Sequence, residues 1–224
     1  MLAKMMRRIH DTVGNPSEGK SISSRCRAAR FRELMRRFPE LERMRVLDLG
    51  GTPHFWHSAP VRPAYVTTLN LDNQYDVQES WLEHVVADAC DIAALDFCAG
   101  DYSLVVSNSL IEHVGGYQRR KELSRVIAAA APAHWIQTPD RYFPIEPHYL
   151  APGFQFLPIK MRAAAIRHWP IAHERVYTGA DAVAQVLTID LISATELQHL
   201  FPYSEIWHER LVGVSKSIVA VKVN

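Results

Sequence analysis

Three acidic residues stand at the ends of short apolar runs, at spacings that can bring them together when the chain folds. Asp48 precedes the tight turn of Gly50 and Gly51, and Asp72 and Asp88 follow the next two apolar runs. In an open sheet of parallel strands, a ligand binds beyond the carboxyl ends of the strands, where a glycine turn lets it approach the backbone. Asp72 can then accept hydrogen bonds from both hydroxyls of a ribose, and Asp88 can face the amino group of an adenine. The three acids together predict a nucleoside site.

The glycine turn favours one kind of nucleoside ligand over another. A turn that cradles pyrophosphate normally reads Gly-x-Gly-x-x-Gly at the start of a helix, whereas Gly50-Gly51-Thr52-Pro53-His54 lacks the later glycines. A sulfonium cofactor carries a positive centre and a zwitterionic amino acid, which suit a loop beside Asp48 better than a phosphate does. Each acid alone is a weak signal, because an aspartate after a strand commonly caps the next helix. Their order and spacing support the prediction.

The elements that must position these residues follow from the apolar pattern. Short apolar runs alternate with helical stretches, which predicts parallel strands joined by crossovers, and 118–131 is the clearest crossover helix. The small turn 213–216 separates two closing strands and predicts that they pair antiparallel. We therefore expect an α/β fold that is Rossmann-like and doubly wound, with a mostly parallel seven-stranded sheet and an antiparallel C-terminal strand. The expected strands are the run from Arg45, then 65–71, 84–87, 102–107, 134–137, 205–212 and 217–223.

The length and composition are those of a single domain. The chain has 224 residues, 48% of them hydrophobic, which is enough for one substantial core and short for two. Lysine and arginine number 25 and aspartate and glutamate 24, so a net charge of +1 provides no field to hold a phosphate backbone. We expect no nucleic-acid partner. Residues 1–44 are expected to form an N-terminal helical segment that packs as a lid, and residues 45–224 the main domain.

The cysteines and the apolar runs indicate a cytoplasmic location. Cys26, Cys90 and Cys98 are an odd set without metal-ligand spacing, which is typical of reduced thiols rather than of disulfides. No run approaches the roughly 18 uninterrupted apolar residues of a membrane span, and the first ten residues lack the apolar stretch of a signal peptide. We therefore expect no stable insertion into a membrane.

Several segments match a known protein family in order and spacing. The most specific are Tyr102–Val114, a strand and the turn after it, and Thr138–His148, which is rich in proline and aromatic residues. Further matching segments are Val46–Thr52, Asp72, Val86–Ala89 and Ser217–Val221. With these residues the chain resembles the class I S-adenosylmethionine-dependent methyltransferases, in their small-molecule, methyltransferase type 11-like branch. The resemblance extends from about residue 45 to the C-terminus. It implies an enzyme with S-adenosyl-L-methionine as cofactor.

The resemblance also implies which residues bind that cofactor. One departure concerns the first loop, where the usual third glycine is absent and Pro53-His54-Phe55-Trp56 follows instead. The pocket for the methionine end is therefore expected to have a different shape, or to bind the cofactor weakly. Asp48, Gly50 and Gly51 are expected to contact the methionine end, and Asp72 and Asn73 the ribose. Asp88 and Ala89 are expected to contact the adenine, and backbone groups of Ser107 and Asn108 to lie near the sulfonium.

Two histidines are the candidates for a general base. Methyl transfer is an in-line displacement on an already activated donor, so the protein has to align the acceptor and exclude water. A hydroxyl acceptor gains from a base that removes its proton, and histidine is the side chain best matched to neutral pH. His113 follows the fourth strand, and His148 lies in the Pro-rich and aromatic segment. Purely structural roles for both histidines remain open, as does a divalent metal held by Glu112, His113 and His148.

The long connection 138–181 is expected to form the acceptor side of the domain. Connections of this length inside a compact domain are usually functional. Its aromatic residues predict either an acceptor pocket or ordinary packing. Its segment 157–169 mixes basic and apolar residues, as in a peripheral lipid contact, a lid or a homodimer contact. The leading hypothesis is O-methylation of a sugar, glycan-type or other hydroxylated small molecule. The alternatives are N- or C-methylation and a non-catalytic cofactor-binding scaffold. The aromatic residues are Tyr142, Phe143, Tyr149, Phe154 and Phe156.

Overall fold

A computed structural model describes residues 22–71, 75, 77, 79–91, 100–167 and 178–223. Two of the predicted cofactor contacts, Asp72 and Asn73, lie outside these residues, as does Cys98. The chain divides into two compact units, and each is described by itself. Unit 1 comprises residues 1–33 and 141–189, and unit 2 comprises residues 34–140 and 190–224.

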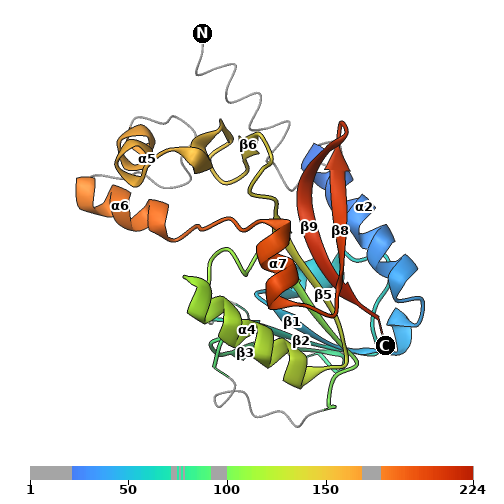
Figure 1. The fold of residues 1–224 in the computed structure, drawn as a ribbon. Helices are drawn as coiled ribbons and strands as arrows, with labels where there is room; N and C mark the ends of the chain where they lie inside the picture. Colours follow the sequence, from blue (N-terminus) through green and yellow to red (C-terminus); the bar gives the residue numbers. More distant parts are fainter. Residues whose placement is uncertain are drawn as a thin grey trace. The chain divides into compact units, whose positions relative to one another are not determined.

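Unit 2 is built on a seven-stranded sheet in the order β3-β2-β1-β4-β5-β9-β8 (Figure 1). Strands β1 to β5 pair parallel to one another, whereas β9 pairs antiparallel to both β5 and β8. This arrangement confirms the predicted fold class, a mostly parallel Rossmann-like sheet with one antiparallel strand at its C-terminal end. The strands are β1 (Arg45–Leu49), β2 (Tyr65–Asn70), β3 (Leu82–Val86), β4 (Leu104–Asn108), β5 (Ala133–Pro139), β8 (Glu205–Leu211) and β9 (Val214–Lys222).

Helices α4 (Tyr117–Ala130) and α7 (Ala194–Leu200) cover one face of this sheet, as Figure 1 shows. Apolar residues at helical spacing on α4, such as Leu123 and Ile127, are fully buried against strand residues of the same core. The N-cap of α7 is Ser193, whose hydroxyl accepts the backbone N–H of Glu196. The buried guanidinium of Arg120 on α4 pairs with Glu196 and so ties the two helices together.

Helical elements stand on both sides of β1 in the sequence. Helix α2 (Ile22–Arg37) lies within the segment 1–44 that was expected to be helical, and it is followed by the 3-10 helix η1 (Leu41–Arg43). Directly after the glycine turn comes the short helix α3 (Pro53–His57), which begins at a proline whose fixed φ suits the first helical position. No helix in the described ranges is long and apolar enough to cross a membrane.

Unit 1 is a small helical unit with a two-stranded sheet. Strands β6 (Ile145–Glu146) and β7 (Ala151–Pro152) pair antiparallel across a four-residue turn. A capping box of Thr178 and Asp181 begins α6. The remaining elements are η3 (Phe154–Phe156), α5 (Ile159–Ile166) and α6 (Gly179–Leu187). Their shared core consists of Tyr149, Ala151, Phe154, Ala163, Ile166, Ala182 and Val186.

Candidate functional site

The glycine turn after β1 lies where the strand order of the sheet reverses. Strand β1 pairs with β2 on one side and with β4 on the other, so the chain leaves β1 at a topological switch point. Gly50 adopts a positive φ of 76°, a conformation that side-chain-bearing residues rarely adopt, and its N–H donates to Leu69 O of β2 at 2.8 Å. The carbonyl of Gly51 accepts a hydrogen bond from the side-chain amide of Asn70. The turn is therefore fixed by backbone and amide contacts to β2.

Asp48, the predicted acid of this turn, is a buried carboxylate held by a tryptophan. Its side chain is 1% exposed, and its Oδ2 accepts the indole N–H of Trp56 at 2.8 Å. Its other oxygen, Oδ1, has no hydrogen-bond donor among the described residues. Burial raises the pKa of Asp48 to about 7, and the hydrogen bond from Trp56 offsets part of that rise. A buried oxygen without a donor in the protein is a natural partner for a polar ligand or a water.

Trp56 belongs to the segment Pro53-His54-Phe55-Trp56, which stands where a third glycine was expected in the first loop. Thr52 is the extended N-cap of α3, and α3 carries Trp56 back over the end of β1. Trp56 is itself 1% exposed, so its indole is buried beside the carboxyl group of Asp48. The expected difference in shape at this end of the site stays a prediction. Trp56 is a residue that the sequence analysis did not assign.

The raised pKa of Asp48 makes the stability of the fold depend on pH in a defined direction. In the unfolded chain the carboxyl loses its proton near its usual value of 3.8, whereas in the folded protein it does so near 7. The stabilising contribution of the buried acid is complete below about pH 4 and is lost as the pH rises to about 7. It amounts to roughly 4 kcal/mol. We expect Asp48→Asn to flatten this part of the stability profile, measured by urea unfolding between pH 4 and 8. An unchanged slope in the variant would contradict the assignment.

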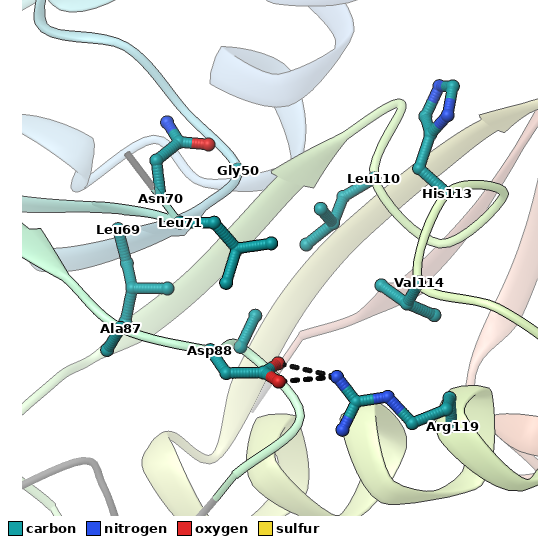
Figure 2. A pocket seen from close by; sticks show the side chains of 11 residues that line it. Gly50, Leu69, Asn70, Leu71, Ala87, Asp88, Leu110, His113, Val114 and Arg119 are labelled. Carbon is teal, nitrogen blue, oxygen red and sulfur yellow. Dashed lines mark hydrogen bonds and ion pairs between the residues drawn. The ribbon is translucent and has the colours of Figure 1, made fainter. Parts of the chain in front are cut away.

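A pocket of about 220 Å³ opens next to the turn, at the carboxyl ends of β1, β2, β3 and β4. Figure 2 shows the side chains of Leu71, Leu110 and Val114 directed into it, with Asp88 and Arg119 at its lower edge. Its walls are mainly apolar, and its charged groups are gathered at one end. Pockets for whole drug-sized ligands typically measure about 300–1,000 Å³, so this pocket has room for a part of a nucleoside cofactor. The lining residues are Gly50, Leu69, Asn70, Leu71, Ala87, Asp88, Ala89, Leu110, His113, Val114 and Arg119.

Asp88, predicted to face an adenine, is held by its neighbours in a fixed orientation. Arg119 Nη2 donates to Asp88 Oδ1 at 2.8 Å and to Oδ2 at 2.5 Å, and Cys90 N donates to Oδ1 at 2.9 Å. Burial acts to raise the pKa of Asp88, but the hydrogen bonds from Cys90 and Arg119 and the guanidinium charge outweigh it and lower the pKa. Asp88 is therefore an ionised acceptor at the edge of the pocket. Arg119, on the first turn of α4, was not predicted.

The end of β4 supplies backbone and amide groups beside the turn. The hydroxyl of Ser107 is fully buried and donates to Leu49 O at 3.0 Å, so this side chain joins β4 to β1. Asn108 is partly exposed, and no donor in the described part of the chain reaches its Oδ1. Ser109 adopts a positive φ of 56° and is anchored to Gln137 through its backbone N–H. The chain therefore turns sharply directly after β4, and the backbone contact predicted for Ser107 and Asn108 stays a prediction.

Glu112 and His113, which follow this turn, have different surroundings. Glu112 is 1% exposed, its Oε2 accepts the hydroxyl of Thr138 at 2.9 Å, and its carbonyl accepts Asp190 N. These contacts give Glu112 a structural role in joining three segments of unit 2. His113 is exposed and lines the rim of the pocket, and in Figure 2 its ring is directed away from the pocket centre.

His148 lies in unit 1, in the turn between β6 and β7, and a buried glutamate orients it. Glu146 is 2% exposed; its Oε1 lies 2.7 Å from His148 Nδ1, and its Oε2 accepts Tyr149 N at 2.7 Å. A carboxylate on one ring nitrogen fixes the tautomer and leaves the other nitrogen as the acceptor. Glu146 is only two residues from His148, and its sequence proximity could have suggested this pairing. The metal hypothesis needs residues of both units and stays a prediction.

The aromatic residues of unit 1 divide between packing and exposure. Tyr149 and Phe154 are buried, with ring centroids 4.5 Å apart in the core of the unit. Tyr142 and Phe156 are exposed and stack on each other with centroids 6.4 Å apart. The side-chain amide of Gln155 donates to the carbonyls of Arg141 and Phe143, the two neighbours of Tyr142 in the sequence. The first pair therefore packs in the core of the unit, whereas the second pair lies at its surface.

Comparisons with known proteins show what else has this fold. The sequence matches no protein-family model and no curated protein sequence. An S-adenosylmethionine-dependent methyltransferase from Mesorhizobium loti is 14% identical, with a TM-score of 0.54 over 88% of this chain and 96% of its own. A possible exported protein from Bordetella parapertussis is also 14% identical, with a TM-score of 0.54 over 98% and 79%. Phosphoethanolamine N-methyltransferase 2 from Haemonchus contortus, in complex with phosphomonomethylethanolamine and S-adenosylhomocysteine, has 14% identity and a TM-score of 0.51 over 81% and 38%. At these identities, the likeness establishes a shared fold.

Proposed function

We propose that the protein is an enzyme that transfers a methyl group from S-adenosyl-L-methionine to a small-molecule acceptor. The observation that carries this proposal is the pocket at the carboxyl ends of β1 to β4, bounded by a glycine turn and by an ionised aspartate. In a sheet of this order, the switch point is where a nucleoside ligand binds. The Mesorhizobium loti structure with this fold is itself an S-adenosylmethionine-dependent methyltransferase, which supports the same cofactor here.

The residues of the site fit this cofactor. The apolar walls suit a purine ring, and Asp88 at the edge of the pocket can accept a hydrogen bond from the exocyclic amino group of that ring. Gly50 and Gly51 expose backbone at the turn, and the donor-free Oδ1 of Asp48 suits a cationic or water-bridged partner at the methionine end. Asp72 and Asn73 remain the proposed ribose contacts. Together with Ala89, Ser107 and Asn108, these residues would hold the cofactor, which supplies an activated methyl group when bound.

His148 is the proposed general base on the acceptor side, with His113 as the second candidate. Glu146 holds the Nδ1 side of the His148 ring, so the Nε2 side would take the proton of an acceptor hydroxyl as that oxygen attacks. The exposed pair Tyr142 and Phe156 offers an aromatic surface of the kind that carries sugar rings. We propose that residues 138–181 form this acceptor side of the domain, and that residues 1–44 act as a lid.

The acceptor is proposed to be a sugar, glycan-type or other hydroxylated metabolite. N- or C-methylation is the main alternative, and the N-methyltransferase of Haemonchus contortus that shares the fold supports the N-methylation form of it. A cytoplasmic location, a homodimer and a type 11-like relationship are further parts of the proposal. Helix α5 exposes Ile159, Lys160 and Met161, a mixture that supports a peripheral contact with lipid or with a lipid-linked acceptor.

Methyl transfer from a radiolabelled donor tests the proposed activity directly. The purified protein is incubated with the labelled cofactor and a panel of hydroxylated, amino and lipid-linked acceptors, with and without a chelator. We expect label in a hydroxylated product, and turnover that survives chelation. Label in an amine product would favour the N-methylation alternative, and loss of turnover with chelator would favour the metal. A protein that binds the cofactor but labels no acceptor would favour the scaffold interpretation.

A further inference from the structure

The hydrogen bonds around Asp88 leave room for one more donor. A carboxylate offers about four lone-pair positions, two on each oxygen. On Oδ1 both are used, by Cys90 N and by Arg119 Nη2, whereas on Oδ2 only Arg119 donates. The remaining position is on Oδ2, and Figure 2 shows the carboxylate of Asp88 at the edge of the pocket. An incoming group that donates a single hydrogen bond completes the set.

Arg119 is placed to control what Asp88 can recognise. It lies on the first turn of α4, its side chain lines the same pocket, and both side chains are about 40% exposed. A single guanidinium nitrogen, Nη2, donates to both oxygens of the carboxylate, so Arg119 restrains the orientation of the Asp88 side chain and supplies a positive charge beside it. Its Nη1 lies 3.6 Å from Glu122 Oε2, one turn further along the helix, which steadies the guanidinium from its other side.

We propose that Arg119 is a positioning residue that makes Asp88 a selective reader of the purine 6-amino group, so that the site takes adenosyl and rejects 6-oxopurine cofactors. This inference rests on the proposed cofactor. An ionised carboxylate can only accept hydrogen bonds. A 6-amino group can donate the missing hydrogen bond to Oδ2, whereas a 6-oxo group would place a second acceptor oxygen against the carboxylate oxygen. A hydrogen bond to a charged group contributes enough to separate the two ligands by roughly 10- to 100-fold in Kd.

The matched ligands are S-adenosylhomocysteine and S-inosylhomocysteine, which differ at position 6 of the purine. Their Kd values are measured by calorimetry for the wild type and for Arg119→Met, which keeps an apolar stem and loses the charge and the donors. The wild type is expected to prefer the adenosyl ligand by roughly 10- to 100-fold, and Arg119→Met by less than about threefold. Arg119→Lys keeps a point charge and should retain more of the preference than Arg119→Met. Lys121→Met, on the same helix outside the pocket, is expected to match the wild type.

The pH profile separates positioning from a merely structural role. The charged and titratable groups around Asp88 are Arg119 and Glu122 on α4 and the thiol of Cys90. In Arg119→Met the guanidinium no longer lowers the pKa of Asp88, so, as the pH is lowered, the preference should begin to fall at a higher pH than in the wild type. Asp88→Asn, which can donate to a 6-oxo group, is expected to lose or reverse the preference.

The outcomes distinguish this inference from the proposed function. If the wild type binds neither ligand, the proposed function fails and this inference fails with it. If the wild type binds and discriminates, but Arg119→Met keeps the full preference, the role of Arg119 is refuted and the proposed function stands. Tighter binding of S-adenosylhomocysteine by Arg119→Met would also refute it, because Arg119 would then be a competitor that the ligand displaces from Asp88.

Discussion

Replacing Gly51 with alanine is expected to lower the free energy of unfolding by roughly 2–5 kcal/mol. A Cβ at this position would lie 1.8 Å from Asp48 Oδ2, far inside the van der Waals contact distance. The carboxylate that it meets is buried and held by Trp56, so it cannot move aside without breaking that hydrogen bond. The φ of Gly51 is not in the positive region, so the side-chain contact alone causes the cost. Urea unfolding of the two proteins measures the difference.

Two further variants show whether the contact with Asp48 is the cause. In an Asp48→Ala background the colliding atoms are gone, and Gly51→Ala should then add less than about 1 kcal/mol, as a double-mutant cycle would reveal. Gly179→Ala is the control, because a Cβ on this first residue of α6 meets no heavy atom within 4 Å. We expect this control to be neutral or slightly stabilising. An equal cost of Gly51→Ala in both backgrounds would show that Asp48 is not responsible.

Replacing His148 with glutamine is expected to reduce kcat by about 10²- to 10⁴-fold, with the Kd for S-adenosylhomocysteine unchanged within about threefold. The reason is that the proposed base is lost, whereas the cofactor pocket of unit 2 keeps its lining residues. Glu146→Gln should reduce kcat in the same direction, since an amide cannot orient the ring as the carboxylate does. Steady-state kinetics with the identified acceptor, together with calorimetry, separate the two effects.

Controls keep this prediction specific to His148. His113→Gln removes the second candidate, which lies on the rim of the pocket with its ring directed away from its centre (Figure 2). If His148 is the base, this variant should retain most of its turnover. In Glu146→Gln the pH profile of kcat should shift relative to the wild type, whereas a purely structural defect would lower kcat equally at every pH. Full turnover by both His148→Gln and His113→Gln would refute both histidine assignments.

The fold could be predicted from the sequence because its information is local. The central strands of the sheet are short apolar runs, and turn or helix signals stand beside them, as with Gly50 after β1 or Pro53 at the start of α3. Parallel strands have their carboxyl ends at one edge, so acids at those ends gather there once the order is known. For this reason the sequence is sufficient to indicate Asp48 and Asp88 as candidates.

The partners that tune these acids could not be predicted, because they depend on packing between distant segments. Arg119 follows Asp88 by 31 residues, and the pairing exists only because α4 packs beside the end of β3. Trp56 is near Asp48 in sequence, but nothing in its type indicates that its indole turns back to the carboxylate rather than into the core. Glu146 is the exception, since its place two residues before His148 is a local signal.

Calorimetric titration of S-adenosylhomocysteine into the wild-type protein tests the central claim most directly. We expect saturable binding at one site per chain, weakened by Asp88→Asn, whose uncharged amide no longer supplies the ionised acceptor at the edge of the pocket. Saturation would place a nucleoside cofactor in this chain independently of any acceptor. Absence of binding by both S-adenosylhomocysteine and S-adenosyl-L-methionine, in a protein shown to be folded by cooperative unfolding, would contradict the account.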